Sequence, residues 1–190
     1  MRHLDWFTVV IYLLLIVAGV FSIYAASYDF DNASIFDFDE FSGKQIRWIG
    51  FALALAVILI VFDSRVYESY AYPIYLVVLM VMLLTIFVAP DIKGSRSWLV
   101  FGPLRFQPAE FGKFATALAL AKLFSGYGFR LNASKNNYVK ALLIIFIPVF
   151  LILAQKETGS ALAYLALFFV LYREGMSGLV LLAAFCAVLF

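Results

Sequence analysis

The chain has 190 residues, of which 65% are hydrophobic and 14% are charged. A soluble domain is about half apolar and about one quarter charged, and a chain this short cannot bury such an excess in its own core. The composition therefore excludes a soluble globular domain, a disordered segment and a disulfide scaffold, since there is a single cysteine. It predicts a polytopic membrane protein, and a net charge of +2 gives no reason to expect nucleic acid as a partner.

Long apolar runs predict the first helices. A helix that crosses a bilayer needs roughly 20 mostly apolar residues, and the first run is too long for a signal peptide, whose apolar core has about 7–15 residues. We expect Pro73 at the first position of the third helix, where proline is tolerated, and Pro90 just after its end. The four predicted spans are residues 6–26, 46–62, 72–89 and 108–124.

The next two apolar runs, residues 141–154 and 159–172, are each only 14 residues long. Neither is long enough to span comfortably, so we expect two short helices whose tight turn lies in a cavity below the membrane surface, with Pro148 kinking the first. A seventh run extends from Leu179 to Phe190 without a polar cap. We therefore expect the front part of a longer membrane protein; a short terminal helix within the membrane is the alternative.

These runs predict an all-α fold: a polytopic transmembrane helix bundle of six to seven helices, forming one integral membrane domain over residues 1–190. Basic residues are enriched in cytoplasmic loops, and the loop 125–140 contains three of them and no acid, which favours a cytoplasmic N-terminus. The loop 27–47 is acidic and would lie outside. A solvated loop is the preferred interpretation of its acids, although a divalent cation is possible: Asp29, Asp31, Asp37, Asp39 and Glu40.

Two charges open the fourth run. Pro108 fits the first helical position and Glu110 the third, where a carboxylate interacts well with the helix dipole. Lys113 lies one turn deeper on the same face, and an unpaired charge inside a membrane costs about 3 kcal/mol or more. The pair Glu110–Lys113 is predicted to be either a staple between helices or part of a polar cavity, with Gln107 just before it.

A second polar group falls at the turn between the two short runs. Glu157 precedes a helix rich in small residues, of a kind that lets a neighbouring helix approach closely. Glu157 either faces the same outer cavity as Glu110 or belongs to a helix start that Thr158 caps. In the loop 90–107, Arg96 and Arg105 offer donors for a phosphate group beside Trp98, although solvated arginines and an interfacial tryptophan are equally compatible with the pattern.

Three motifs resemble those of the SEDS family, the shape, elongation, division and sporulation proteins RodA and FtsW. Three other segments resemble RodA rather than FtsW: Asp5-Trp6, Ile23-Tyr24-Ala25-Ala26-Ser27-Tyr28 and Phe169-Val170-Leu171-Tyr172-Arg173-Glu174-Gly175. The similarity covers nearly the whole chain. Ala109, Lys156, Glu157 and Ser160 depart from the family pattern, which weakens any exact geometric role for position 157. The motifs are Gly94-Ser95-Arg96-Ser97-Trp98, Gln107-Pro108-Ala109-Glu110-Phe111-Gly112-Lys113 and Glu157-Thr158-Gly159-Ser160-Ala161-Leu162.

The resemblance implies a bundle of about ten helices in the bacterial plasma membrane. It implies a peptidoglycan glycosyltransferase that polymerises lipid II, needs no organic cofactor and works with a class B penicillin-binding protein. The family's presumed catalytic aspartate is expected beyond Phe190, so no residue of this chain is predicted to be catalytic. The residues expected to line the substrate cavity are Arg96, Trp98, Arg105, Gln107, Glu110, Lys113, Glu157 and Thr158.

Two other functions remain open from the sequence. Paired charges within a membrane and short helices that meet at a polar turn also suit a transporter or flippase of a lipid-linked precursor. A membrane scaffold for cell-wall synthesis is the third interpretation.

Overall fold

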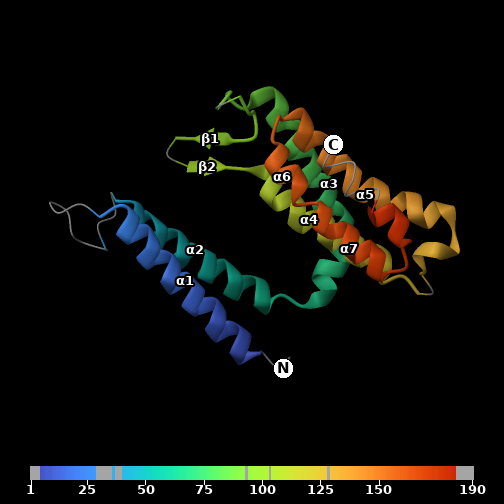
Figure 1. Cartoon of the computed structure of the whole chain (residues 1–190), viewed down its shortest axis with the longest axis horizontal. Helices are drawn as coiled ribbons and strands as arrows, with labels where there is room; N and C mark the ends of the chain where they lie inside the picture. Colours follow the sequence, from blue (N-terminus) through green and yellow to red (C-terminus); the bar gives the residue numbers. More distant parts are fainter. Residues whose placement is uncertain are drawn as a thin grey trace. The chain divides into compact units, whose positions relative to one another are not determined.

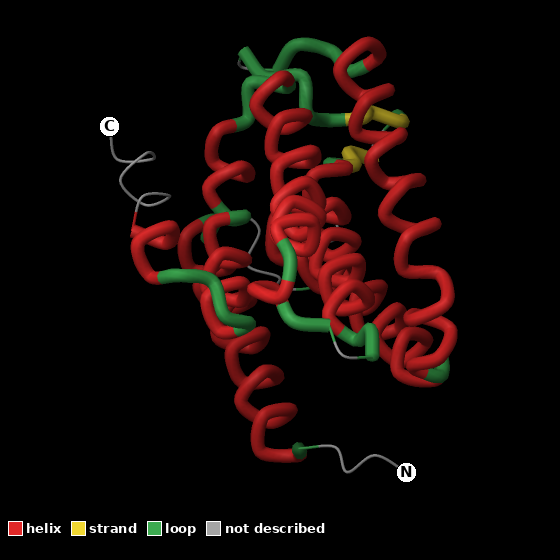
Figure 2. The backbone as a smooth tube through the Cα atoms, turned by 90° about the vertical axis from the view of Figure 1, so that its right-hand side faces the viewer, coloured by secondary structure: helices red, strands yellow, loops and turns green. Residues whose placement is uncertain are grey.

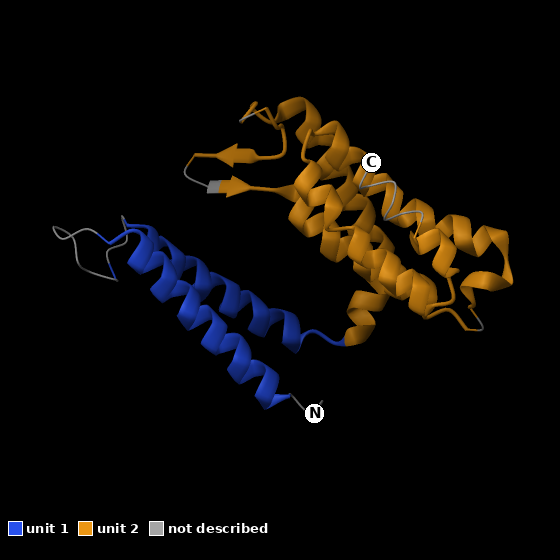
Figure 3. Cartoon of the chain, in the orientation of Figure 1, with its two compact units in different colours: residues 1–63 blue, residues 64–190 orange. Residues whose placement is uncertain are grey.

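The computed structural model describes residues 5–28, 36, 40–92, 94–102, 104–127 and 129–182. Helices make up most of this part, which also contains two short strands and the connecting loops (Figure 2), so the predicted all-α fold is confirmed. The chain forms two compact units, residues 1–63 and residues 64–190 (Figure 3). The acids at positions 29, 31, 37 and 39, and the end of the seventh run from residue 183, lie outside the described residues.

The first unit is a pair of helices that pack side by side, α1 (Trp6–Ala26) and α2 (Phe41–Val61) (Figure 1). The Asp5 carboxylate caps α1, because it accepts hydrogen bonds from the backbone N–H groups of Phe7 (3.1 Å) and Thr8 (3.4 Å). The apolar stretches of both helices have no buried residue. Within this unit, the apolar side chains of the two helices are therefore not covered by a core.

The second unit is a helix bundle with its own core. Its long helices α3 (Ser64–Val88), α4 (Pro108–Phe124) and α5 (Lys135–Ala154) pack against one another. Buried side chains from these helices and from the segment after them form one cluster, which includes Met82, Leu120, Ile145, Tyr164 and Leu171. Its remaining elements are β1 (Leu99–Phe101), β2 (Leu104–Phe106), the 3-10 helix η1 (Leu131–Ala133), α6 (Thr158–Leu162) and α7 (Leu165–Arg173).

Four of the described helices, α1, α2, α3 and α5, are long and apolar enough to cross a membrane. The predicted multi-pass membrane protein is thereby confirmed. The helix α4 follows the predicted range 108–124 but has only 17 residues, and the segment Thr158–Arg173 is another short apolar helix.

Two predicted helix starts are wrong. The helix α2 begins at Phe41 instead of Ile46, and α3 begins at Ser64 instead of Tyr72. Pro73 therefore lies inside α3 and not at its first position. The reason is physical: the first turns of both helices contain charged residues such as Lys44 and Glu68, which interrupt an apolar run without interrupting a helix.

The two short helices predicted after residue 140 are also corrected. The helix α5 begins at Lys135 and has 20 residues, so it is long enough to span a membrane. The following apolar run divides into α6 and α7, with a turn at Ala163 and Tyr164. The tight turn between the two runs is confirmed at residues 155–157.

The antiparallel pair β1–β2 was not predicted beyond its turn residues. Leu99 pairs with Phe106, Val100 with Arg105, and Phe101 with Leu104. Gly102 has a φ of +60°, a conformation that glycine adopts at no steric cost. Strands of three residues are too short to produce a recognisable alternation of polar and apolar residues.

A proline within α5 is compensated by a side chain of α3. Pro148 has no N–H group, so the carbonyl oxygen of Ile144, one turn earlier, loses its helical donor. The Tyr75 hydroxyl donates a hydrogen bond to that oxygen at 2.9 Å. The backbone group that Pro148 would leave unpaired is therefore satisfied within the bundle, as a membrane interior requires.

Neighbouring side chains approach the backbone of α4 closely at Gly112. A Cβ at this position would lie 2.8 Å from the Tyr164 hydroxyl oxygen and 2.9 Å from the Met82 sulfur. Around Gly159, the region where we expected such an approach, an added Cβ would meet nothing within 4 Å. The small residue that allows close packing is therefore the glycine of the second motif.

Candidate functional site

The loop before β1 meets the turn between α5 and α6, and a carboxylate joins them. The Glu157 Oε2 atom accepts hydrogen bonds from the hydroxyl groups of Ser95 and Ser97, both at 2.8 Å. Hydrogen bonds to a charged acceptor are stronger than neutral ones. Two of the three quoted motifs thus converge on one half-buried acid.

Gln155, two residues before Glu157, makes further hydrogen bonds next to this contact. Its side chain is fully buried, and its Nε2 atom donates to the carbonyl oxygen of Met82 in α3 at 2.8 Å. Its backbone carbonyl oxygen accepts from the backbone N–H of Arg96 at 3.0 Å and lies 3.2 Å from the Ser95 hydroxyl oxygen, whose proton is donated to Glu157. Gln155 therefore fixes the end of α5 to both α3 and the 94–98 loop.

The backbone turns sharply between Gln155 and Glu157. Lys156 has a φ of +60°, which is uncommon for a residue with a side chain. The helix α6 begins at Thr158, and Glu157 takes the N-cap position without a capping bond from its side chain. The alternative in which Thr158 caps a helix is therefore wrong; Thr158 is the first helical residue and is exposed.

The start of α4 lies at the same side of the bundle. Pro108 and Glu110 occupy the first and third helical positions, as predicted, after Gln107 as N-cap. The Gln107 amide donates to the Ser160 hydroxyl at 3.4 Å, a long hydrogen bond. It connects the second motif with the third.

Glu110 and Lys113 form an ion pair with a nitrogen–oxygen distance of 2.8 Å. Both belong to α4, so this contact joins successive turns of one helix and does not staple two helices. Their side chains are 52% and 36% exposed, respectively. Such an accessible pair is worth little for stability, and its carboxylate and ammonium remain accessible to a ligand.

The structure places the other three predicted residues around the hairpin. Arg96 lies between the two serines that bind Glu157, and its side chain is exposed. Arg105 is an exposed residue of β2, and Trp98 is half-buried just before β1. The phosphate-binding role of the two arginines stays a prediction.

The sequence reasoning missed the residues that hold the site together. We selected Arg96, Trp98 and Glu157 from the motifs, but not Ser95, Ser97 and Gln155, which bond to Glu157, to Arg96 and to Met82. A signal was present, because a glutamine directly after a long apolar run has to be either exposed at the helix end or buried with a partner. Among the described residues, no group of three or more His, Cys, Asp or Glu side chains is placed to hold a metal ion.

Long apolar helices, a buried core in the second unit and a polar cluster at the helix ends define an α-helical, multi-pass membrane protein. The sequence profile of the FtsW/RodA/SpoVE family, described as cell cycle protein, matches residues 5–190. The chain therefore belongs to this family, which confirms the SEDS resemblance.

Relatives and solved structures agree with this assignment. The chain is 33% identical to peptidoglycan glycosyltransferase MrdB of Escherichia coli K12 over 153 residues, 77% of this chain and 41% of the relative. It is 28% identical to stage V sporulation protein E of Bacillus subtilis over 160 residues, 82% of this chain and 43% of the relative. The crystal structure of the rod shape determining protein RodA of Thermus thermophilus matches with a TM-score of 0.83 and 30% identity, over 96% of this chain and 57% of that one.

A solved peptidoglycan synthase complex that coordinates polymerization and crosslinking contains a chain that also matches, with a TM-score of 0.83 and 30% identity. All of this chain and 53% of that one are covered. The chain thus spans about two fifths of MrdB and stage V sporulation protein E and somewhat more than half of the solved structures.

Proposed function

We propose that this chain is the N-terminal part of a RodA-like peptidoglycan glycosyltransferase that polymerises lipid II during cell elongation. The family match along residues 5–190, with relatives named peptidoglycan glycosyltransferase, carries this proposal. The protein would lie in the bacterial plasma membrane with its N-terminus in the cytoplasm, as one integral membrane domain. The class B penicillin-binding protein is the proposed partner, supported by the likeness to a chain of a peptidoglycan synthase complex.

The proposed reaction joins two lipid-linked sugars. The 4-hydroxyl oxygen of an incoming lipid II sugar forms a bond to the donor sugar carbon, while the bond from that carbon to the undecaprenyl pyrophosphate breaks. The pyrophosphate leaves with the bonding electrons, and the hydroxyl proton passes to a general base. We expect that base beyond Phe190, so residues 1–190 alone would be inactive.

In the proposed reaction, residues 1–190 would bind the lipid-linked substrate and provide positive charge near its pyrophosphate. The exposed guanidinium groups of Arg96 and Arg105 would stabilise the leaving pyrophosphate, with Trp98 beside them. Glu157, held by two serines, would keep the 94–98 loop in position. The pair Glu110–Lys113, with Gln107 and Thr158, would line the polar end of the cavity.

A polymerisation assay with fluorescent lipid II tests the proposal. Residues 1–190 and the same chain extended over the region that completes its relatives would each be purified with the class B penicillin-binding protein. We expect glycan chains from the extended protein and none from residues 1–190. Sustained polymerisation by residues 1–190 alone would refute the expected inactivity.

The same assay separates the other two functions. Movement of lipid II across vesicles without chain growth would identify a flippase, and neither growth nor movement would favour a scaffold. In the extended protein, Arg96→Gln should reduce polymerisation, since it removes a phosphate donor. Lys140→Gln is the matched control, because it removes one exposed positive charge at a distance in sequence from every motif.

A further inference from the structure

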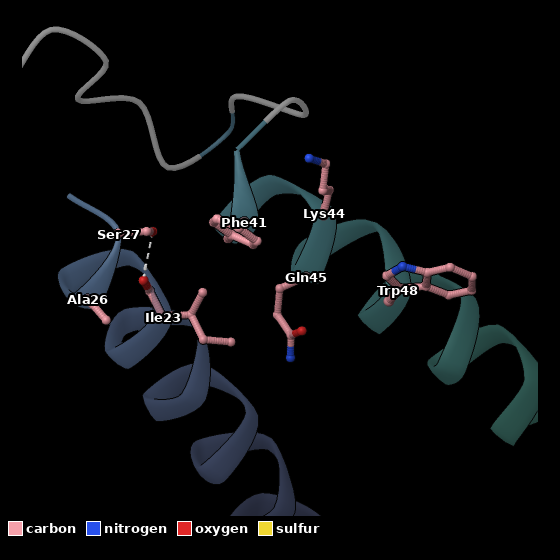
Figure 4. Close-up of a pocket in the computed structure, with 7 residues that line it drawn as sticks. All are labelled: Ile23, Ala26, Ser27, Phe41, Lys44, Gln45 and Trp48. Atoms are coloured by element: carbon pink, nitrogen blue, oxygen red, sulfur yellow. Dashed lines mark hydrogen bonds between the residues drawn. The ribbon is translucent and has the colours of Figure 1, made fainter. Parts of the chain in front are cut away.

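In the first unit, a pocket of about 500 Å³ lies between the end of α1 and the start of α2 (Figure 4). Lys44, the charged residue among the seven that line it, already has an interaction partner. The pocket therefore presents no free charge that would select a ligand. The exposed aromatic side chains of the second unit are more informative.

The β1–β2 hairpin carries apolar side chains that the helix bundle leaves exposed. The hairpin extends outward from the end of the second unit at which α4 begins (Figures 1 and 3). Phe101, next to the turn, is 64% exposed, and Val100 is 42% exposed. Exposed apolar patches mark surfaces that contact a membrane or another protein.

The base of the hairpin is fixed to the bundle by its other apolar residues. Leu99 and Phe106 are partners in the strand register, and Leu99 is buried. The Phe106 ring stacks on the Phe111 ring of α4, with the ring centres 4.7 Å apart. The base of the hairpin therefore packs on α4, and Phe101 lies beyond that contact.

The exposed side of α4 continues the apolar surface of the hairpin. Phe111 is 48% exposed and Phe114 is 52% exposed, and their spacing of three residues places both on one side of the helix. The helix α4 packs against α3 and α5, which are long and apolar enough to cross a membrane. The surface that includes the hairpin is thus continuous with one that faces out from membrane-crossing helices.

Two contacts show that α3 and α4 are antiparallel. Near one end of the pair, a Cβ on Gly112 would lie 2.9 Å from the Met82 sulfur. Near the other end, the Lys122 ammonium binds the Glu68 carboxylate at 2.9 Å. Residues of the two helices can therefore be compared by their level along a common axis.

The start of α4 lies close to the level at which α3 ends. Val88, the last residue of α3, lies about 9 Å beyond Met82 at 1.5 Å per residue. Pro108, the first residue of α4, lies about 6 Å beyond Gly112 by the same measure. Because Met82 and Gly112 are at one level, α4 begins only about 3 Å below the end of α3.

This level is the boundary of the hydrocarbon layer. The 25 residues of α3 are about 38 Å long, whereas the layer is about 30 Å thick. If α3 is centred in the layer, its end extends about 4 Å beyond the boundary, and Pro108 lies at the boundary itself. The strand β2 ends at Phe106, two residues before Pro108, so the hairpin lies at the level where headgroups meet acyl chains.

We propose that the β1–β2 hairpin inserts Phe101 into the boundary between lipid headgroups and acyl chains. Apolar side chains of membrane-surface elements bury at this level. Strand residues alternate in direction, so Val100 and its partner Arg105 lie on the other face, where Arg105 stays available to a phosphate group. The insertion does not depend on the proposed reaction, so its failure would leave the proposed function untouched.

A nitroxide spin label at position 101 tests the proposal. The chain has a single cysteine, so Cys186→Ser with Phe101→Cys gives one labelled position. In phosphatidylcholine vesicles, relaxation of the label by oxygen, which concentrates among acyl chains, is compared with relaxation by a nickel chelate, which stays in water. We expect the ratio of the oxygen effect to the nickel effect to be high at position 101.

Three labelled positions serve as controls. Ala133→Cys, at an exposed residue of η1 between α4 and α5, should give the low ratio of water. Leu143→Cys, at a half-exposed residue near the middle of α5, should give the high ratio of acyl chains, with position 101 between the two. Val100→Cys should give a lower ratio than Phe101→Cys, because neighbouring strand residues point to opposite faces.

Two results would overturn the proposal. A ratio at position 101 equal to that at position 133 would place the hairpin tip in water. Weak relaxation by both reagents at position 101, in residues 1–190 or in the extended protein of the polymerisation assay, would show that protein covers the tip instead of lipid.

Discussion

The helices of residues 1–63 leave their apolar side chains exposed, whereas the helices of residues 64–190 bury part of theirs against one another. None of the apolar stretch of α1 or α2 is buried, compared with 22% of that of α3 and of α5. Hydropathy alone does not separate these cases, since all four helices are apolar enough to span a membrane. The difference lies in partners: α3 and α5 pack against α4 and against each other within one unit.

The helix α4 shows what protein-facing surface requires. Its buried positions include Ala109, Gly112, Ala115, Thr116 and Ala119, which allow close approach of neighbouring helices. The Thr116 hydroxyl donates to the Gly112 carbonyl oxygen at 2.7 Å within the same helix. By contrast, α1 has no buried residue within the described part of the chain.

The largest expected loss of stability comes from a substitution in α4, and the same substitution in α2 should cause no such loss. Gly112→Leu would place a side chain where Tyr164 and Met82 already lie, and such overpacking costs about 1–3 kcal/mol. Gly50→Leu in α2 is the matched control, because an added Cβ there meets nothing within 4 Å. It should be neutral or slightly stabilising, since leucine favours a helix more than glycine does.

Thermal unfolding in detergent measures both variants. Equal destabilisation by Gly112→Leu and Gly50→Leu would contradict the distinction between a packed and a lipid-facing surface.

The next prediction concerns the contact between the 94–98 loop and the turn before α6. Glu157→Ala removes the acceptor that the Ser95 and Ser97 hydroxyl groups share, and because Glu157 is half-buried the net loss of stability should be about 1 kcal/mol. We expect faster amide hydrogen exchange at Arg96, whose N–H bonds to Gln155. Exchange within the first unit should not change.

Glu174→Ala is the control for that variant. Glu174 pairs with the exposed Arg173 at 3.3 Å, so its removal should have little effect on exchange in the loop. If the two variants had the same effect, the proposed role of Glu157 in holding the loop would be wrong.

A smaller effect is expected at the ion pair of α4. Lys113→Gln removes a pair whose members are 36% and 52% exposed, and exposed pairs contribute about 0.2–1 kcal/mol. The unfolding midpoint should therefore change little. A loss of stability as large as that of Gly112→Leu would show that Lys113 is a structural residue and would favour the scaffold function.

The smallest effect is at the start of α1 in the first unit. The Thr8 hydroxyl donates to the Asp5 carboxylate at 2.6 Å, and this bond, with those from the backbone, lowers the pKa of Asp5 below its usual value. The cap is thus complete above the usual pKa and is lost as the pH falls through the lowered one.

Amide exchange at Phe7 and Thr8 would measure this fraying. Asp5→Asn keeps a capping oxygen and should remove the pH dependence. Acid-induced exchange that persists in Asp5→Asn would assign the effect to another group.

Much of the fold could be predicted from apolar runs, but the starts of α2, α3 and α5 could not. The range 6–26 was confirmed because Asp5 and Ser27 bound an uninterrupted run. The start of α3 was missed because Arg65 and Glu68 lie in its first turns, where a charge can reach water or a partner; Glu68 binds Lys122 of α4 at 2.9 Å. Hydropathy therefore predicts the segments that cross the membrane but not the residues at which their helices begin.

The site was predicted in part. The spacing of Glu110 and Lys113 predicted their pairing, since both lie on one face of a single helix. The contact of Glu157 with Ser95 and Ser97 joins positions about 60 residues apart, and no local pattern reports such a distance. The resemblance identified the segments that meet, but not the atoms that bind.

The hydrogen bond from the Tyr75 hydroxyl to the Ile144 carbonyl oxygen implies that positions 75 and 148 evolve together. While residue 148 is proline, loss of the tyrosine hydroxyl leaves a backbone carbonyl unpaired inside the bundle. If residue 148 becomes alanine, its N–H can serve that carbonyl, and phenylalanine becomes acceptable at position 75. Among relatives, substitutions at 75 and 148 should therefore occur together, with the proline lost before the hydroxyl.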